Sequence, residues 1–148
     1  LEFRRVLFRS PMSFLSKRNE FWQLSISVIS SNFGQPDAEV TILQRHGYEA
    51  SAHEANEALD AVFPDLFVIN LDLEDGLVLT HRIRQRSHHV GIVLVIGADN
   101  GAGKMRAFAS GADNCLYKPY ATEELLAVAG SLSRRLVGFT SRRHSEQP

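Results

Sequence analysis

The apolar run from Leu66 to Leu71 most constrains what this chain can fold into. It is short, rich in large and β-branched residues, preceded by Pro64 and interrupted only by Asn70. Such a run is typical of a strand that is buried on both faces of a parallel sheet. Open sheets of this kind place their ligand sites at the carboxyl ends of the strands. A functional site is therefore expected around Asn70 and the acidic residues that follow it: Asp72, Glu74 and Asp75.

The remaining hydrophobic pattern alternates between strand and helix. Four further strands are predicted, at residues 24–29, 48–52, 91–96 and 114–117. Five helices are predicted, at residues 36–45, 54–62, 76–86, 101–110 and 122–136. Regular alternation with short loops predicts an α/β fold, a doubly wound five-stranded parallel sheet with helices on both faces. The flavodoxin-like strand order 2-1-3-4-5 suits such a unit when the dinucleotide-binding glycine pattern is absent.

Length, cysteine content, apolar runs and charge limit the classes of protein to which this chain can belong. A chain of 148 residues holds one domain with short tails. The single cysteine, Cys115, excludes an internal disulfide framework and favours a reducing compartment, the cytoplasm. No apolar run approaches the roughly 20 residues that span a bilayer. Residues 19–133 carry seven Lys/Arg and fifteen Asp/Glu, a net charge of −8, which argues against direct contact with nucleic acid.

The two ends of the chain are treated separately from the fold. Residues 1–10 resemble the translated read-through of a sequencing-library adapter and are left out of the fold prediction. Residues 11–22 are expected to form a disordered lead-in, and residues 23–137 the folded domain. Residues 138–148 lack a core pattern and are expected to be a linker or tail toward an output domain that this chain does not contain.

Three stretches at consistent mutual spacing carry a family resemblance: PDLFVINL at 64–71, GADNCLYKP at 111–119 and EELLAVAGSLSRRL at 123–136. With them the chain resembles the receiver domain of bacterial two-component response regulators, CheY-like domains of phosphorelay signal transduction. It is most similar to the subgroup that precedes a winged-helix DNA-binding domain. The resemblance implies a non-enzymatic signalling domain that regulates transcription. A sensor kinase or another regulatory protein is the expected partner, and DNA is contacted only through the missing C-terminal domain.

The resemblance also assigns positions to the phosphorylation site. The phosphoacceptor position falls on Asn70, the metal-binding acidic pair on Ser30 and Ser31, the hydroxyl position on Ile96, the aromatic switch position on Cys115, and the phosphate-contacting lysine on Lys118. Only the lysine keeps the residue type that the family uses. The connection from Asn70 to Gly76 is also about two residues shorter than is usual in the family.

These departures predict a degenerate site. An amide is not a nucleophile for phosphoryl transfer, and serine hydroxyls are weaker Mg²⁺ ligands than carboxylates. Ile96 cannot donate a hydrogen bond to a phosphoryl oxygen. We therefore expect no catalytic residue, no cofactor, and Mg²⁺ binding that is lost or weak. The domain is expected to act independently of phosphorylation.

Two alternatives remain open at this point. Asp72 is a candidate phosphoacceptor, because strand alternation places it on the same side as Asn70. Its competing interpretation is that of an acid placed before the next helix, where negative charge is favourable. A flavodoxin-like cofactor-binding domain would use the segment 30–34 as its phosphate loop. The glycine-rich segment 97–104 does not have the spacing of a nucleotide-binding P-loop.

The resemblance further implies a homodimer through the fourth helix, fifth strand and fifth helix. Lys104, Asp113 and Glu124 match positions of the cross-subunit ion-pair network, whereas Asn114 and Val128 depart from it. A Lys104–Glu124 pair between subunits is therefore expected, and the Asp113–arginine pair between subunits is expected to be lost. The competing interpretation is ordinary surface charge, in which an exposed pair contributes only about 0–1 kcal/mol.

Overall fold

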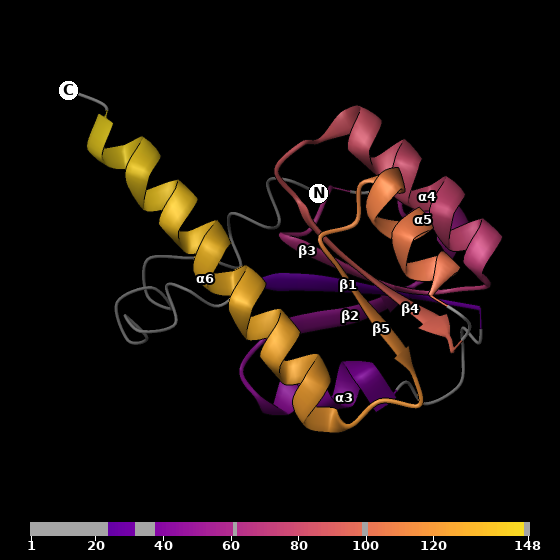
Figure 1. Cartoon of the computed structure of the whole chain (residues 1–148). Coiled ribbons are helices and arrows are strands. Elements are labelled where there is room, and N and C mark those ends of the chain that lie inside the picture. Colours follow the sequence, from indigo (N-terminus) through magenta and orange to yellow (C-terminus); the bar gives the residue numbers. More distant parts are fainter. Residues whose placement is uncertain (1–23, 32–37, 61, 99–100, 147–148) are drawn as a thin grey trace.

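A computed structural model describes residues 24–31, 38–60, 62–98 and 101–146, with side chains up to residue 136. Its centre is a five-stranded parallel sheet in the order β2-β1-β3-β4-β5 (Figure 1). The strands are β1 Ser25–Ser30, β2 Glu49–His53, β3 Leu66–Asn70, β4 Gly91–Gly97 and β5 Asn114–Lys118. The predicted fold class and strand order are confirmed.

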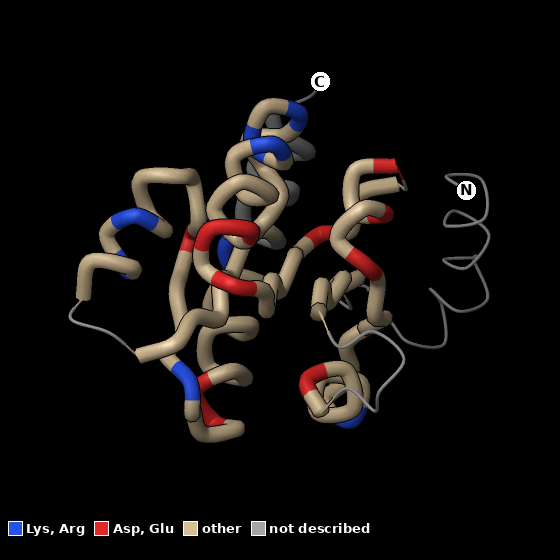
Figure 2. The backbone as a smooth tube through the Cα atoms, turned by 90° about the vertical axis from the view of Figure 1, so that its right-hand side faces the viewer, with Lys and Arg blue, Asp and Glu red and all other residues tan. Residues whose placement is uncertain are grey.

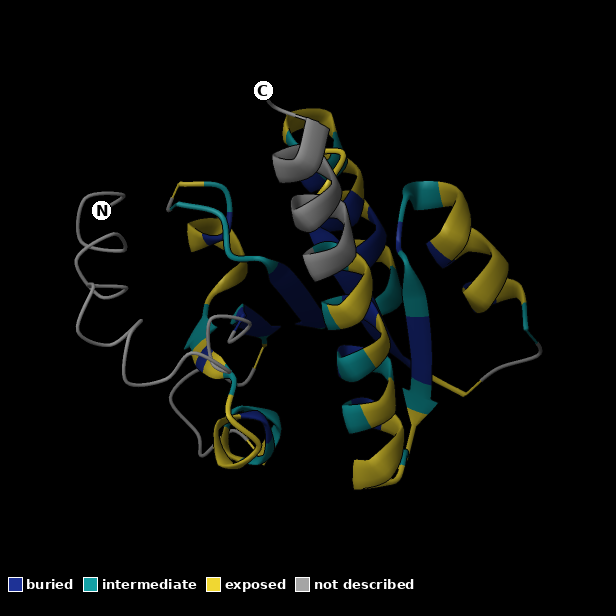
Figure 3. Cartoon of the chain, turned by 90° about the vertical axis from the view of Figure 1, so that its left-hand side faces the viewer, coloured by how far each residue is buried: buried dark blue, intermediate teal, exposed yellow. Residues whose placement is uncertain are grey.

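Helices cover both faces of this sheet. They are α3 Ala38–Arg45, α4 Leu73–Arg86, α5 Ala102–Ser110 and α6 Thr122–Glu146. Helices α3 and α6 pack on one face, and α4 and α5 on the other (Figure 1). The strands are buried between the two layers, whereas the outward faces of the helices are exposed (Figure 3).

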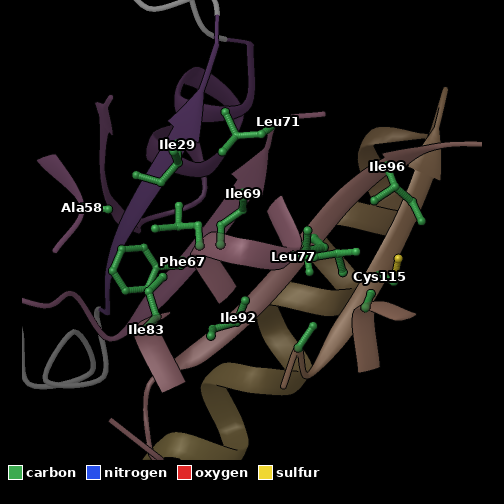
Figure 4. Close-up of a cluster of buried hydrophobic side chains, with 14 of the residues drawn as sticks. Ile29, Ala58, Phe67, Ile69, Leu71, Leu77, Ile83, Ile92, Ile96 and Cys115 are labelled. Atoms are coloured by element: carbon green, nitrogen blue, oxygen red, sulfur yellow. The ribbon is translucent and has the colours of Figure 1, made fainter. Parts of the chain in front are cut away.

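Strand β3 lies in the middle of the core, as its apolar run predicts. Phe67 and Ile69 point toward α4 and α5, where they pack with residues of β4 such as Ile92 (Figure 4). Leu66 and Val68 point the other way, into the cluster formed with α3 and α6. The alternation of side chains along a strand is what lets one apolar run serve both layers.

The helix predicted at residues 54–62 is not formed. A single 3-10 turn, Ala55–Glu57, takes its place, with the Glu57 carboxylate accepting a hydrogen bond from the Glu54 amide at 3.0 Å. Ala58 is the one fully buried residue among the described positions of this segment. Its face therefore buries little apolar area, and packing of such a face is the main source of helix stability. The described part of the chain has four α-helices rather than five.

Two helices are longer than predicted. Helix α4 begins at Leu73 instead of Gly76, directly after the N-cap residue Asp72. Its early start follows from the short connection after β3 and from the favourable acids in its first turn. Helix α6 passes its predicted end at Leu136 and continues to Glu146, so the backbone is helical over much of the predicted linker. No helix in the described ranges combines the length and the apolar character that crossing a bilayer requires.

Candidate functional site

The carboxyl ends of the central strands bring several predicted site residues to one edge of the sheet. Ser30, the last residue of β1, is in register with Asn70, the last residue of β3. On the other side of the sheet centre, Gly97 of β4 is in register with Lys118 of β5. Ser31 follows β1 as an exposed turn residue. The sequence prediction that these positions share one edge is consistent with this topology.

Asn70 is bound by a residue that the sequence prediction did not assign to the site. Its side-chain Nδ2 donates to both carboxylate oxygens of Glu39, at 3.4 Å and 3.2 Å. The phenolic O–H of Tyr120 donates to the same carboxylate. All three side chains are half-buried. We call Glu39, Asn70 and Tyr120 the Glu39 cluster.

A signal for Glu39 was present in the sequence. It precedes Leu43 by four positions, and residues four apart lie on the same face of a helix. Leu43 is fully buried, so the face of α3 that carries both Leu43 and Glu39 points at the sheet. Tyr120 has no comparable local signal, because it lies in the connection between β5 and α6.

Asp72 does not lie on the strand beside Asn70. Strand β3 ends at Asn70, and Asp72 is the exposed N-cap residue of α4. The alternation that would place both residues on one side of a strand therefore does not extend to Asp72. The prediction that strand periodicity aligns them is wrong, because the short connection turns directly into the helix.

Ile96 and Cys115 belong to the hydrophobic core. Their side chains are 1% and 6% exposed and pack in the cluster on the α4 and α5 side (Figure 4). Cys115 is therefore a small core residue of β5. Tyr117, two residues later on β5 and on the same face as Cys115, is half-buried against this cluster and was not predicted.

Lys118 is the one residue predicted for the phosphorylation site that carries a positive charge. Lys118 is exposed and forms no ion pair with any residue in the described ranges. Acidic residues are spread over several elements rather than gathered at one edge (Figure 2). Among the residues that the structure describes, no group of three or more His, Cys, Asp or Glu could hold a metal ion.

Asp113, predicted for a dimer interface, is engaged within the chain. Its carboxylate accepts hydrogen bonds from Arg84 at 2.7 Å, from Arg135 at 2.9 Å and from the amide of Ile92 at 2.8 Å. These arginines belong to the same chain, so the expected loss of an Asp113–arginine pair between subunits stays a prediction. The two arginines come from α4 and α6, helices on opposite faces of the sheet, which local sequence cannot pair.

The other two interface candidates lie on the surface. Lys104 is exposed on α5 and makes no ion pair within the described part. Glu124 is exposed on α6, where its carboxylate accepts a hydrogen bond from the amide of Ala121 at 2.9 Å. Neighbouring positions on α5 expose apolar side chains, Met105 and Phe108.

A salt bridge links the first turn of α4 to α5. The Arg106 guanidinium donates to the two carboxylate oxygens of Glu74 at 2.7 Å and 3.0 Å. This hydrogen bonding holds the pKa of the Glu74 carboxyl below its ordinary value and raises the pKa of Arg106. Glu74 is thereby engaged with α5.

Comparisons with known proteins agree with this architecture. Residues 23–129 match the family model of the response regulator receiver domain. The virulence transcriptional regulatory protein PhoP of Salmonella typhimurium (strain 14028s / SGSC 2262) is 31% identical over 106 residues, which cover 68% of this chain and 47% of that protein. The transcriptional regulatory protein BasR of Escherichia coli (strain K12) is 36% identical over 98 residues, covering 62% of this chain and 44% of that protein.

A solved structure shows the same fold. The receiver domain of NtrX from Brucella abortus superposes with a TM-score of 0.67 at 26% identity, covering 74% of this chain and 98% of that one. The chain spans about half the length of the curated relatives it matches. Since the family model covers most of the chain and the sheet has the expected order, the chain belongs to the response regulator receiver domain family.

Proposed function

We propose that this receiver domain signals without phosphoryl transfer to Asn70, as a protein-interaction module of a two-component response regulator. The observation that carries the proposal is the asparagine at the end of β3, whose amide is hydrogen-bonded to Glu39. An amide does not form an acyl phosphate. The names of PhoP and BasR, both transcriptional regulatory proteins, support a DNA-binding output domain outside this chain.

The donor atoms around Asn70 support weak or absent Mg²⁺ binding. Mg²⁺ prefers carboxylate oxygens in octahedral geometry. The two strand-end positions where the family places acids carry the hydroxyls of Ser30 and Ser31. The one carboxylate hydrogen-bonded to Asn70, that of Glu39, already accepts bonds from two neutral donors. The match to the receiver family supports a non-enzymatic signalling role, and we propose the cytoplasm as its compartment.

Partners are proposed at the face formed by α5, β5 and α6. Exposed Met105 and Phe108, which are 76% and 44% exposed, supply apolar area there, and Lys104 and Glu124 supply opposite charges. Two copies related by a two-fold axis would place each Lys104 near the partner's Glu124. With Asp113 occupied inside the chain, this interface has fewer ion pairs than the resemblance implies. A sensor kinase or another regulatory protein is the other proposed partner.

Exposure to a phosphodonor tests the central proposal. The full chain is incubated with acetyl phosphate and Mg²⁺, and its intact mass is measured beside that of a receiver with an aspartate at the phosphoacceptor position. We expect an adduct on the reference protein and none on this chain.

An adduct that Asp72→Ala abolishes, and that Asp75→Ala leaves in place, would make Asp72 the phosphoacceptor and overturn the proposal. Asp72 is retained as this alternative because its carboxylate is exposed at the same end of the sheet. The flavodoxin-like alternative is not pursued, since residues 23–129 match the receiver family.

A further inference from the structure

We propose that the carboxylate of Glu39 is an internal regulatory ligand that joins three segments at the phosphoacceptor edge and holds them in one arrangement without phosphate. The inference deepens the proposed function, because it names what fixes the state of a receiver that is not phosphorylated. It rests on the contacts of the Glu39 cluster.

The cluster connects parts of the chain that are distant in sequence. Glu39 lies in the first turn of α3, Asn70 ends β3, and Tyr120 lies between β5 and α6. The contacts span 31 and 81 positions. One half-buried carboxylate therefore ties α3 to the end of the central strand and to the segment that enters α6.

The residue types in the Glu39 cluster complement one another as hydrogen-bond acceptor and donors. The carboxylate is the one ionised group of the three, and the amide of Asn70 and the phenol of Tyr120 both donate to it. With the Asn70 amide turned around, its oxygen would face the carboxylate, so the hydrogen bond requires the nitrogen there. An aspartate at position 70 would place two carboxylates in contact, and such a pair does not ionise fully.

Asparagine at the phosphoacceptor position and glutamate at position 39 therefore belong together. Asn70 lacks the carboxylate of a phosphoacceptor, and with Glu39 it forms a favourable amide–carboxylate pair. This complementarity distinguishes a specific contact from a site that has only lost its phosphorylation chemistry. It also predicts that the two residues can be exchanged.

The exchange provides the test. In the full chain, Asn70→Asp places two carboxylates in contact, and Glu39→Gln places two amides in contact. The double variant restores an amide–carboxylate pair with its polarity reversed. Amide hydrogen exchange is followed in α3 and in the segment between β5 and α6, with amides of α4 as the internal reference.

We expect Asn70→Asp to accelerate exchange in α3 about tenfold or more, because hydrogen bonds to charged groups commonly contribute that much to an equilibrium. The double variant is expected to return to within about threefold of wild type, a non-additivity that marks direct contact. Tyr120→Phe, which removes only the hydroxyl, is expected to accelerate exchange in the segment between β5 and α6.

Controls repeat the same chemical changes elsewhere. Glu49→Gln and Asn56→Asp alter exposed side chains of β2 and the 3-10 turn. In both variants, amide hydrogen exchange in α3 and in the segment between β5 and α6 is expected to match that of wild type. Wild-type exchange in Asn70→Asp, or a double variant whose effect is the sum of the two single ones, would overturn the inference. No phosphodonor is used, so this outcome is independent of whether the chain accepts a phosphoryl group.

Discussion

Arg84 and Asp113 form an ion pair across the amino-terminal edge of the sheet, with 2.7 Å between the guanidinium nitrogen and the carboxylate oxygen. Both side chains are less than one-fifth exposed, at 17% and 18%. The same guanidinium donates to the carbonyl oxygens of Gly111 at 2.8 Å and Val90 at 2.6 Å. Arg84 thus connects α4 with the starts of β4 and β5.

Removing the charge of Arg84 should destabilise the fold strongly. Arg84→Met keeps much of the apolar stem but leaves the Asp113 carboxylate and the carbonyl groups of Ser87, Val90 and Gly111 with fewer donors. Loss of one partner of a buried pair costs about 3–5 kcal/mol, and Arg135 offsets part of this, so we expect about 2–3 kcal/mol. Urea unfolding measures the difference. Arg82→Met, an exposed position on the same helix, is the control, and equal losses for both variants would refute the assignment.

Gly111 should tolerate alanine much less well than Gly47. Both glycines follow helices with positive φ, 113° and 92°, so both variants incur the backbone cost of about 1–2 kcal/mol. At Gly111 an added Cβ would lie 2.5 Å from Cγ of Arg84, whereas at Gly47 nothing lies within 4 Å. Gly111→Ala is therefore expected to lose about 1–3 kcal/mol more than Gly47→Ala in urea unfolding. Equal losses would mean that the Arg84 stem moves aside freely.

The Glu74–Arg106 pair predicts a small pH dependence of stability. A carboxyl whose pKa is lowered in the folded state adds stability at neutral pH. That contribution is lost as the pH falls below the ordinary value of 4.5 toward the folded-state pKa. The melting temperatures of wild type and Arg106→Gln should therefore differ at pH 7 and converge in acid.

A carboxyl titration by NMR checks the cause directly. The pKa of Glu74 should rise in Arg106→Gln and stay unchanged in Arg82→Gln, which removes an exposed guanidinium elsewhere on the surface. An unchanged pKa in Arg106→Gln would show that the salt bridge does not persist in solution.

The proposed dimer predicts a charge-dependent association. Glu124→Lys would place two lysines opposite each other at two symmetry-related sites, and we expect the dissociation constant to rise about tenfold or more. Sedimentation velocity measures it, with Glu123→Lys as a control of equal charge change on the same exposed stretch of α6. The double variant Lys104→Glu/Glu124→Lys should recover association. A wild-type chain that remains monomeric at high concentration would contradict the proposed dimer.

Local patterns were enough to predict the sheet but not the segment after β2. The apolar runs of β3 and β4 are almost uninterrupted, and each forms a strand buried on both faces. The segment 54–62 has helical spacing, but it is composed partly of alanines and buries little, so it forms only a short turn. The spacing of apolar residues indicates which face of a segment is apolar. Whether a helix forms depends on how much of that face packs against the rest of the fold.

By itself the sequence determined the buried strands of a parallel sheet and the presence of an amide at position 70, because these follow from residue type and spacing along each strand. The tertiary structure alone decided that Glu39 is bound to Asn70 and Tyr120, and that Asp113 is bound to Arg84 and Arg135. The physical reason is that a hydrogen bond depends on distance in space. These partners lie 22 to 81 positions apart in the chain and meet only when the helices pack on the sheet.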